Sequence, residues 1–294
     1  MKTVPFTGSG VAIVTPFDEN GVNYSELDRL IEFQIQNGTD AIISCGTTGE
    51  SSTMSDEEHA QVIAHTVKTV AGRVPVIAGT GSNHTDYSVW LSIEAEKAGA
   101  DGLLLVTPYY NKATQKGVVA HFTAVADAVN IPVIVYDVPA RTGMSLTVDT
   151  CVQLSKVSNI VAVKEASGNV AHAAQIVAAC GDELYVYSGN DDVTVPILSI
   201  GGKGTISVLA NVMPKQTHDM CAQYLCGNTS VATKLQLQMM DLIGALFIEV
   251  NPIPVKAAMQ LMGYDTGRIR LPLTEIEPKN KEILAACMKK AGVI

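Results

Sequence analysis

The sequence carries little charge for its length and lacks any strongly basic segment. Charged residues make up 17% of the 294 residues, and 20 Lys and Arg stand against 29 Asp and Glu, which gives a formal net charge of −9. Because phosphate groups bind to basic surfaces, this balance argues against nucleic acid as a partner. A small anionic substrate is not excluded, since one local Arg or Lys can override the overall sign.

Cysteine pairs and zinc-ligand pairs are absent too. The Cys at positions 45, 151, 180, 221, 226 and 287 are scattered without a Cys-x-x-Cys pair, which favours reduced thiols and a cytoplasmic location. His59 and His65 do not have the spacing that places two zinc ligands on one helix face, so we expect no metal site. The first residues carry no secretory signal and no apolar run is long enough to span a bilayer, so we expect no membrane attachment.

What the chain does contain is a regular alternation of short apolar runs with longer amphipathic segments. Hydrophobic residues make up 47% of it, and near-continuous apolar runs are typical of parallel strands buried on both faces. Between them, Ser55 opens a capping box with Glu58 at the start of a helix. Such units in series favour an α/β fold of the closed (β/α)8 TIM-barrel type over an open sheet. The predicted strands are 10–14, 41–44, 74–78, 102–106, 133–136, 160–164, 184–188 and 204–207.

The alternation ends after about residue 212. Pro214 can open a helix at its first position, residues 229–249 have the pattern of one long helix, and the proline-rich break at 251–254 separates it from two further helices. We therefore predict a catalytic (β/α)8 barrel over residues 1–211. A C-terminal helical region, 212–294, is expected to pack on that barrel.

The strand at 160–164 ends in a lysine, where the catalytic groups of such a barrel are found. Strand alternation places Ile160, Ala162 and Lys164 on one face. If that face points into the barrel, burial lowers the pKa of the Lys164 amine, and a neutral amine can attack a ketone to form an imine. On its own, Lys164 is equally well explained as a lysine that extends from a strand end to solvent.

Polar groups follow several other strands. Tyr136 ends the strand before that of Lys164, so its phenol can reach the same pocket and move protons. The loop Gly46-Thr47-Thr48-Gly49 offers backbone N–H groups and two hydroxyls to a small carboxylate. Arg141 follows Pro139 on a rigid turn and can clamp a carboxylate with its fork of donors. Taken singly, these are also explained as a core aromatic, an ordinary loop and a surface arginine.

Together these motifs resemble the dihydrodipicolinate synthase / N-acetylneuraminate lyase family of class I aldolases over effectively the whole chain. The segment from Tyr136 to Gly143, with Arg141 in it, is similar to the synthase branch, whereas sialic acid lyases typically lack that arginine. The resemblance implies a lyase that condenses pyruvate with L-aspartate 4-semialdehyde through a Schiff base. The product would be 4-hydroxy-tetrahydrodipicolinate, in lysine and diaminopimelate biosynthesis.

The resemblance also implies the catalytic roles. Lys164 would form the imine with pyruvate, and Tyr136, Thr47 and Tyr110 would form a proton relay, with Tyr110 contributed by a second subunit. The assembly that this implies is a homotetramer, a dimer of dimers. No metal or organic cofactor is expected, because the imine supplies the electron sink.

The substrate-binding roles follow in the same way. Thr48 and its loop would hold the carboxylate of pyruvate, and Arg141 would receive the carboxyl group of the semialdehyde. Carbonyl groups near Gly189 and Ile206 would line the pocket.

A second cleft is implied where lysine-sensitive relatives bind their end product. The residues of this chain that match it are Ser51, His59, Asn83 and Tyr109. Asp56 and Tyr87 depart from the pattern, and Tyr87 stands where sensitive enzymes carry a glutamate. Because an ammonium group that lacks a carboxylate partner is costly to bury, we expect weak or absent inhibition by lysine.

Two alternatives remain at this stage. A different pyruvate-dependent class I aldolase, such as a 2-keto-3-deoxy sugar acid aldolase or N-acetylneuraminate lyase, uses the same scaffold with another substrate. A catalytically silent barrel that senses a small molecule is the alternative from a different functional class. The combination of Lys164, Tyr136, Thr47 and Arg141 argues against a sensor, which has no need for an amine aligned with a phenol.

Overall fold

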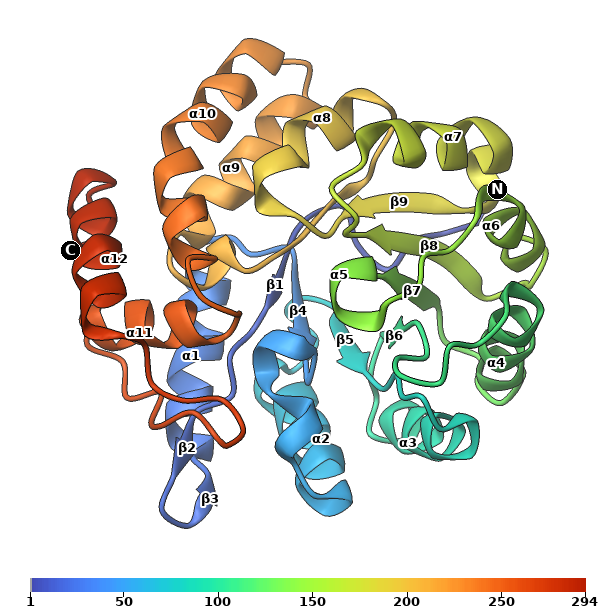
Figure 1. The fold of residues 1–294 in the computed structure, drawn as a ribbon, viewed down its shortest axis with the longest axis horizontal. Coiled ribbons are helices and arrows are strands. Elements are labelled where there is room, and N and C mark those ends of the chain that lie inside the picture. Colours follow the sequence, from blue (N-terminus) through green and yellow to red (C-terminus); the bar gives the residue numbers. More distant parts are fainter. Residues whose placement is uncertain (1) are drawn as a thin grey trace.

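Eight parallel strands close into a barrel in the computed structural model, which describes residues 2–294 (Figure 1). The first strand pairs both with the second and with the last, so the sheet has no free edge. The predicted (β/α)8 barrel is therefore confirmed. In barrel order the strands are β1 (Gly8–Ala12), β4 (Ala41–Ser44), β5 (Val76–Gly79), β6 (Gly102–Val106), β7 (Val133–Asp137), β8 (Ile160–Glu165), β9 (Tyr185–Ser188) and β10 (Gly204–Ser207).

One principal helix follows each barrel strand and covers its outer side (Figure 1). These helices are α1 (Tyr24–Gln36), α2 (Asp56–Val70), α3 (Thr85–Lys97), α4 (Gln115–Asp127), α6 (Val148–Leu154), α7 (Val170–Cys180), α8 (Thr194–Ser199) and α9 (Pro214–Leu225). The predicted capping box of α2 is confirmed, because Ser55 Oγ accepts from the Glu58 N–H and the Glu58 carboxylate accepts from the Ser55 N–H. The short elements are the hairpin of β2 (Phe17–Asp18) and β3 (Gly21–Val22), α5 (Pro139–Thr142), and the 3-10 turns η1 (Thr47–Gly49), η2 (Ser51–Thr53), η3 (Gly181–Glu183), η4 (Asp191–Val193) and η5 (Leu209–Asn211).

The C-terminal part adds α10 (Thr229–Leu246), α11 (Ile253–Leu261) and α12 (Pro278–Lys290). Helix α9 packs against β1 and α8 and so closes the ring of helices, while α10 packs on α9 and α12. The division of the chain at 211/212 stays a prediction. Within residues 2–294, no helix combines the length and apolar character that crossing a membrane requires.

The core consists of two layers separated by the sheet. The inner layer fills the barrel with side chains such as Ile43, Ile77 and Leu104, and the outer layer joins the strands to the helices. At the lower end of the inner layer, the ring of Phe6 stacks on that of Tyr187 with their centroids 4.6 Å apart. These rings fill the interior of the barrel at this end, and a cavity opens at the C-terminal ends of the strands.

An irregularity between β7 and β8 corrects one prediction. Val133 lies beside Ile160, but Ile134 lies beside Ala162, so β8 contains one extra residue at this point. As a result Ile160 belongs to the outer layer, whereas Val161 and Ala162 both belong to the inner one. The expected common face of Ile160, Ala162 and Lys164 is therefore wrong at Ile160. Simple alternation fails wherever a bulge inserts a residue.

Several predicted boundaries also shift. Pro75 has no N–H to donate to the sheet, and β5 begins directly after it, at Val76, rather than at residue 74. The predicted helix 229–249 ends at Leu246. The residues that follow it, Phe247 to Asn251, instead line the cavity at the barrel mouth.

Candidate active site

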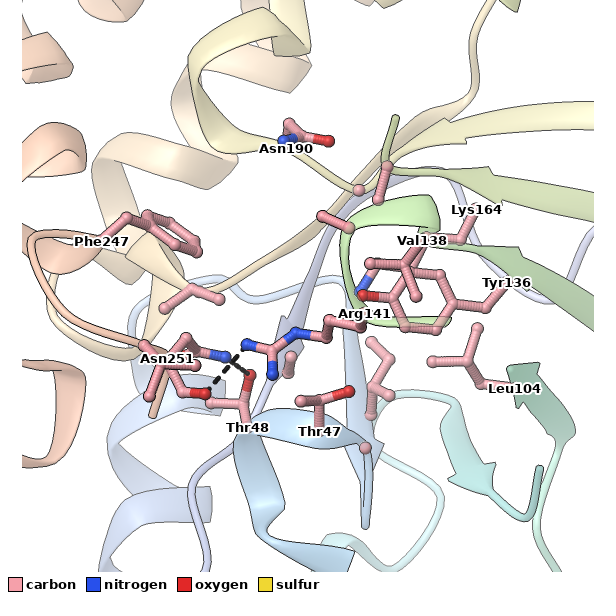
Figure 2. A pocket seen from close by; sticks show the side chains of 18 of the residues that line it. Thr47, Thr48, Leu104, Tyr136, Val138, Arg141, Lys164, Asn190, Phe247 and Asn251 are labelled. Carbon is pink, nitrogen blue, oxygen red and sulfur yellow. Dashed lines mark hydrogen bonds between the residues drawn. The ribbon is translucent and has the colours of Figure 1, made fainter. Parts of the chain in front are cut away.

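A cavity of about 750 Å³ occupies the C-terminal mouth of the barrel. Most of its lining comes from the ends of β4, β7, β8 and β9 and the loops after them. Ala12, Leu104 and Val208 add to it from β1, β6 and the end of β10, and Phe247 to Asn251 line it from the segment between α10 and α11. Its labelled side chains in Figure 2 converge from opposite walls, with Lys164 and Tyr136 on one side and Phe247 and Asn251 on the other. The cavity therefore belongs jointly to the barrel and to the C-terminal region.

Lys164 lies at the inner wall of this cavity and is only 6% exposed. Burial lowers the pKa of its amine from the ordinary 10.5 to about 7, with Asp191 opposing this shift and the charge of Arg141 reinforcing it. Within residues 2–294 its Nζ makes no hydrogen bond or ion pair and lies 4.3 Å from the centre of the Tyr136 ring. A large fraction of Lys164 is therefore a neutral, nucleophilic amine near pH 7.

Gly189 provides the space for that lysine. A Cβ at this position would lie 3.1 Å from Lys164 Cε, 2.9 Å from the Glu165 carbonyl oxygen and 2.6 Å from Ala166 Cβ. Its N–H donates to the Glu165 carbonyl oxygen at 2.7 Å. Any larger residue would clash with Ala166 and the Glu165 carbonyl and would press on the Lys164 chain, so Gly189 shapes the cavity by its lack of a side chain.

Asp191 supplies a buried negative charge close to the same lysine. Its carboxylate is held by the N–H groups of Val208 and Leu209, at 3.0 and 2.9 Å. Burial raises its pKa, while the hydrogen bond from Ser207, these two N–H groups and the charge of Lys164 oppose that rise. The carboxylate thus favours a positive charge on the Lys164 nitrogen, which is the charge that a protonated imine carries.

Tyr136 presents its phenol to the cavity beside Lys164. In the register of the two strands, Tyr136 on β7 lies beside Lys164 on β8. Burial raises its pKa to about 12, although Arg141 and a hydrogen bond with Thr47 act in the opposite direction. Tyr136 therefore keeps its proton at neutral pH and can pass it on, with Thr47 as its neighbour in the chain of hydroxyls.

Thr48, Asn251 and Arg141 form the opposite, polar wall. The Asn251 side-chain amide donates to the Thr48 hydroxyl at 2.9 Å, and the Arg141 guanidinium donates to the Asn251 backbone carbonyl at 3.0 Å. Figure 2 shows both bonds, with the guanidinium lying between the asparagine and the rest of the cavity. Two groups suited to carboxylates, a hydroxyl and a guanidinium, are thus held by one residue.

A buried ion pair lies directly behind this wall. Lys256 on α11 donates to the Glu50 carboxylate at 2.8 Å, and their side chains are 1% and 2% exposed. The other Glu50 oxygen accepts from the Arg270 N–H, while Lys256 also donates to the Arg268 carbonyl. The pair ties α11 to the loop that carries Thr47 and Thr48.

The expected second cleft has a volume of about 480 Å³ and opens next to the cavity, since Thr47, Val138 and Arg141 line both. Of the residues predicted for it, Ser51, His59 and Tyr109 line the cleft, together with Asp56 and Tyr87. The predicted Asn83 is not among its lining residues. It braces the cleft instead, by donating to the Tyr109 carbonyl at 3.2 Å.

Tyr110 and Ile206 lie outside the cavity. Tyr110 is 90% exposed, has φ +69° and is not among the residues that line the cavity of its own barrel. Ile206 is buried in the inner layer below the cavity. The structure thus brings Lys164, Tyr136, Thr47, Thr48, Arg141 and Gly189 together and leaves these two apart.

Sequence reasoning missed the contribution of the C-terminal region. Asn251 was interpreted only as part of a helix break, and Glu50 and Lys256 received no role. A signal for Lys256 does exist, because it is the single charged residue of the apolar helix Ile253–Leu261. A charge in such a helix usually has a buried partner.

Known proteins resemble this chain in both sequence and structure. The family described as the dihydrodipicolinate synthetase family matches residues 5–291. The 4-hydroxy-tetrahydrodipicolinate synthase of Acetivibrio thermocellus is 56% identical over 294 residues, which is 100% of both chains. The dihydrodipicolinate synthase structure from Aquifex aeolicus is 47% identical, with a TM-score of 0.96 over 98% of this chain and 99% of that one. The chloride-inhibited dihydrodipicolinate synthase from Acinetobacter baumannii, solved in complex with pyruvate, is 44% identical, with a TM-score of 0.95 over the same shares.

Proposed function

Because the chain belongs to the dihydrodipicolinate synthetase family, it is a lyase that forms 4-hydroxy-tetrahydrodipicolinate, and we propose that Lys164 carries the reaction as an imine with pyruvate. The reaction condenses pyruvate with L-aspartate 4-semialdehyde, in the synthesis of lysine and diaminopimelate. Its named relatives are synthases, so the sugar-acid lyases and the silent sensor are not favoured.

The reaction begins with attack of the neutral Lys164 amine on the keto carbon of pyruvate. Loss of water gives an imine, which is protonated on nitrogen, and the buried charge of Asp191 favours this cation. The protonated imine withdraws electrons from the adjacent methyl group, which loses a proton to solvent through the proposed relay and becomes an enamine; the same relay later returns a proton. The cavity wall at Gly189 leaves room for these changes at the Lys164 chain.

The enamine carbon then attacks the aldehyde of the second substrate and forms the new C–C bond. The resulting alkoxide takes a proton from the Tyr136–Thr47 pair, for which the raised pKa of Tyr136 is suitable. The amino group of the bound semialdehyde attacks the imine carbon, closes the ring and releases the Lys164 amine. Thr48 holds the pyruvate carboxylate and Arg141 the carboxylate of the semialdehyde in this scheme.

Tyr110 is proposed to complete the proton relay from a second subunit. The observation in support is its 90% exposure, which leaves the whole side chain accessible to a neighbouring subunit. The proposed assembly is a homotetramer, a dimer of dimers, in the cytoplasm. Sedimentation that gives a fully active monomer would contradict the shared relay.

The observation that carries the proposal is the buried, unpaired Lys164 amine. In the experiment, the protein is incubated with pyruvate, reduced with borohydride and digested for mass spectrometry, and a coupled assay follows turnover of both substrates. We expect loss of activity and a pyruvate-derived mass on the peptide with Lys164. A label on another lysine, or none, would refute the imine at this position.

A further inference from the structure

Asn251 occupies an unusual place between the two groups that bind carboxylates in the proposed function. It is 4% exposed and comes from the segment between α10 and α11, more than 200 residues after Thr48 in the sequence. Its side chain contacts Thr48, and its backbone carbonyl accepts from Arg141. In the proposed function, the Asn251 side chain therefore contacts the residue that holds pyruvate, and its backbone carbonyl contacts the residue that holds the semialdehyde.

The hydrogen bond to Thr48 determines where the threonine hydroxyl points. A hydroxyl has one hydrogen to donate and two lone pairs that accept. Since Thr48 Oγ1 accepts from the Asn251 amide at 2.9 Å and donates to no protein group within residues 2–294, its own hydrogen is free for a ligand. Thr48 lines the cavity, so that ligand is the molecule bound there.

The oxygen atom of the Asn251 side-chain amide gives a second, independent indication of the role of this residue. Asn251 Oδ1 is buried and has no hydrogen-bond partner in the described part of the chain, which is costly for the stability of the fold. An apolar residue would avoid this cost, so the packing of the site does not explain an asparagine. The donor half, which acts on Thr48, does explain it.

We propose that Asn251 is a positioning residue that directs the Thr48 hydroxyl at the carboxylate of pyruvate. The inference rests on the proposed function and deepens it. It predicts different effects on the two substrates, because removal of the Asn251 side chain releases Thr48 but leaves the backbone carbonyl that holds Arg141. The buried ion pair between Lys256 and Glu50 also holds the loop that carries Thr48.

The test compares Asn251→Ala and Asn251→Asp with Thr48→Val and the double variant Asn251→Ala/Thr48→Val, and Asn20→Asp at an exposed turn serves as the charge-matched control. Both Asn251 variants should raise the KM for pyruvate by about tenfold or more and leave the KM for the semialdehyde nearly unchanged. Asn251→Asp should have the larger effect, because its carboxylate accepts the Thr48 hydrogen and repels the substrate. The double variant should bind pyruvate no more weakly than Thr48→Val alone.

Thermal unfolding and borohydride trapping complete the design. Asn251→Ala should unfold at or near the wild-type temperature, since it also removes the unsatisfied Oδ1, and high pyruvate concentrations should restore its trapping. An unchanged pyruvate KM, an equal rise in both KM values, or additive effects in the double variant would overturn the inference. If the wild-type enzyme traps no pyruvate on Lys164, the proposed function itself fails. If the wild type and Asn251→Ala trap it equally at low pyruvate, only the role of Asn251 fails.

Discussion

Two buried lysines, Lys164 in the cavity and Lys256 in a buried ion pair with Glu50, have different roles. Lys164, at the barrel mouth, is 6% exposed and makes no ion pair with any residue that the structure describes, and burial lowers its pKa to about 7. Lys256, at the junction with the C-terminal region, is 1% exposed, and its pKa is also lowered by burial, but the Glu50 carboxylate at 2.8 Å opposes that effect. Burial alone therefore does not make a nucleophile. A buried lysine becomes a nucleophile when no carboxylate contacts its amine and favours the charged form.

The free-energy consequences of the two sites differ as well. A buried amine without a partner disfavours the folded state, and this is the condition for a reactive neutral amine. A buried ion pair is held by two opposite charges, and loss of either partner leaves the other uncompensated. The first lysine thus contributes to chemistry and the second to the position of the loop.

Substitution of Lys164 should have the largest effect. Lys164→Met removes the nucleophile, so turnover should fall by roughly four orders of magnitude or more. The same variant should unfold at a higher temperature than the wild type. An unfolded lysine binds its proton up to pH 10.5 whereas the folded one releases it near 7, so its cost to stability is complete below pH 7 and disappears as the pH approaches 10.5. Melting curves of the variant and the wild type at pH 7 and pH 10 check the sign of this difference. A variant that melts at a lower temperature than the wild type at pH 7 would contradict the prediction.

Substitution of Lys256 should give the opposite pattern. Lys256→Met leaves the Glu50 charge buried without its partner, which typically costs about 3–5 kcal/mol of stability. Adding Glu50→Leu to this variant should recover part of the loss, because the unpaired charge is then gone. Urea denaturation of the three proteins measures this, and Lys290→Met, at an exposed ion pair, is the matched control with little expected change.

Arg141 tests the substrate side of the comparison. Arg141→Ala removes a charge-assisted donor, so the KM for the semialdehyde should rise by roughly tenfold to a hundredfold. Imine trapping by pyruvate should remain. Because the Arg141 charge also lowers the pKa of Lys164, the acid limb of the pH profile should move to higher pH. Unchanged semialdehyde kinetics would reopen the sugar-acid alternative.

The pH dependence of the wild type is a smaller and simpler test. Below the pKa of about 7 the Lys164 amine becomes an ammonium, so the rate of imine formation should fall by about tenfold for each pH unit. Single-turnover trapping between pH 5 and 8 would reveal it. A rate that stays constant down to pH 5 would mean that the lysine is already neutral there or does not react.

The smallest expected effect is that of free lysine on activity. Its ammonium group needs a carboxylate, as Lys256 has in Glu50, and the cleft offers Asp56. The Tyr87 hydroxyl already forms a hydrogen bond with the Asp56 carboxylate. Burial and, to a smaller extent, this contact raise the pKa of Tyr87 to about 12. We expect weak or absent inhibition in a lysine titration of the coupled assay. Strong inhibition at low lysine concentrations would show that Asp56 is sufficient.

The barrel itself was predictable because each strand carries its own signal. Apolar runs mark the eight strands, and the lysine, the tyrosine and the Thr47–Thr48 loop occur where those strands end. The face of Ile160 was not predictable, since one bulged residue reverses the alternation. Asn251 and Lys256 were missed for a different reason. Their partners lie 203 and 206 residues away, and no local pattern encodes a contact of that separation.

That separation has a consequence for how the enzyme comes into existence. During synthesis the ribosome releases Lys164 and the whole parallel sheet well before Asn251 and Lys256. A nascent barrel therefore has its nucleophile but lacks one wall of the pocket, and Glu50 has no cation beside it. The pocket is complete only after the segment between α10 and α11 and the helix α11 have been synthesised and have packed against the loop after β4. A prematurely terminated product that has lost this segment carries a lysine without the means to select its substrate.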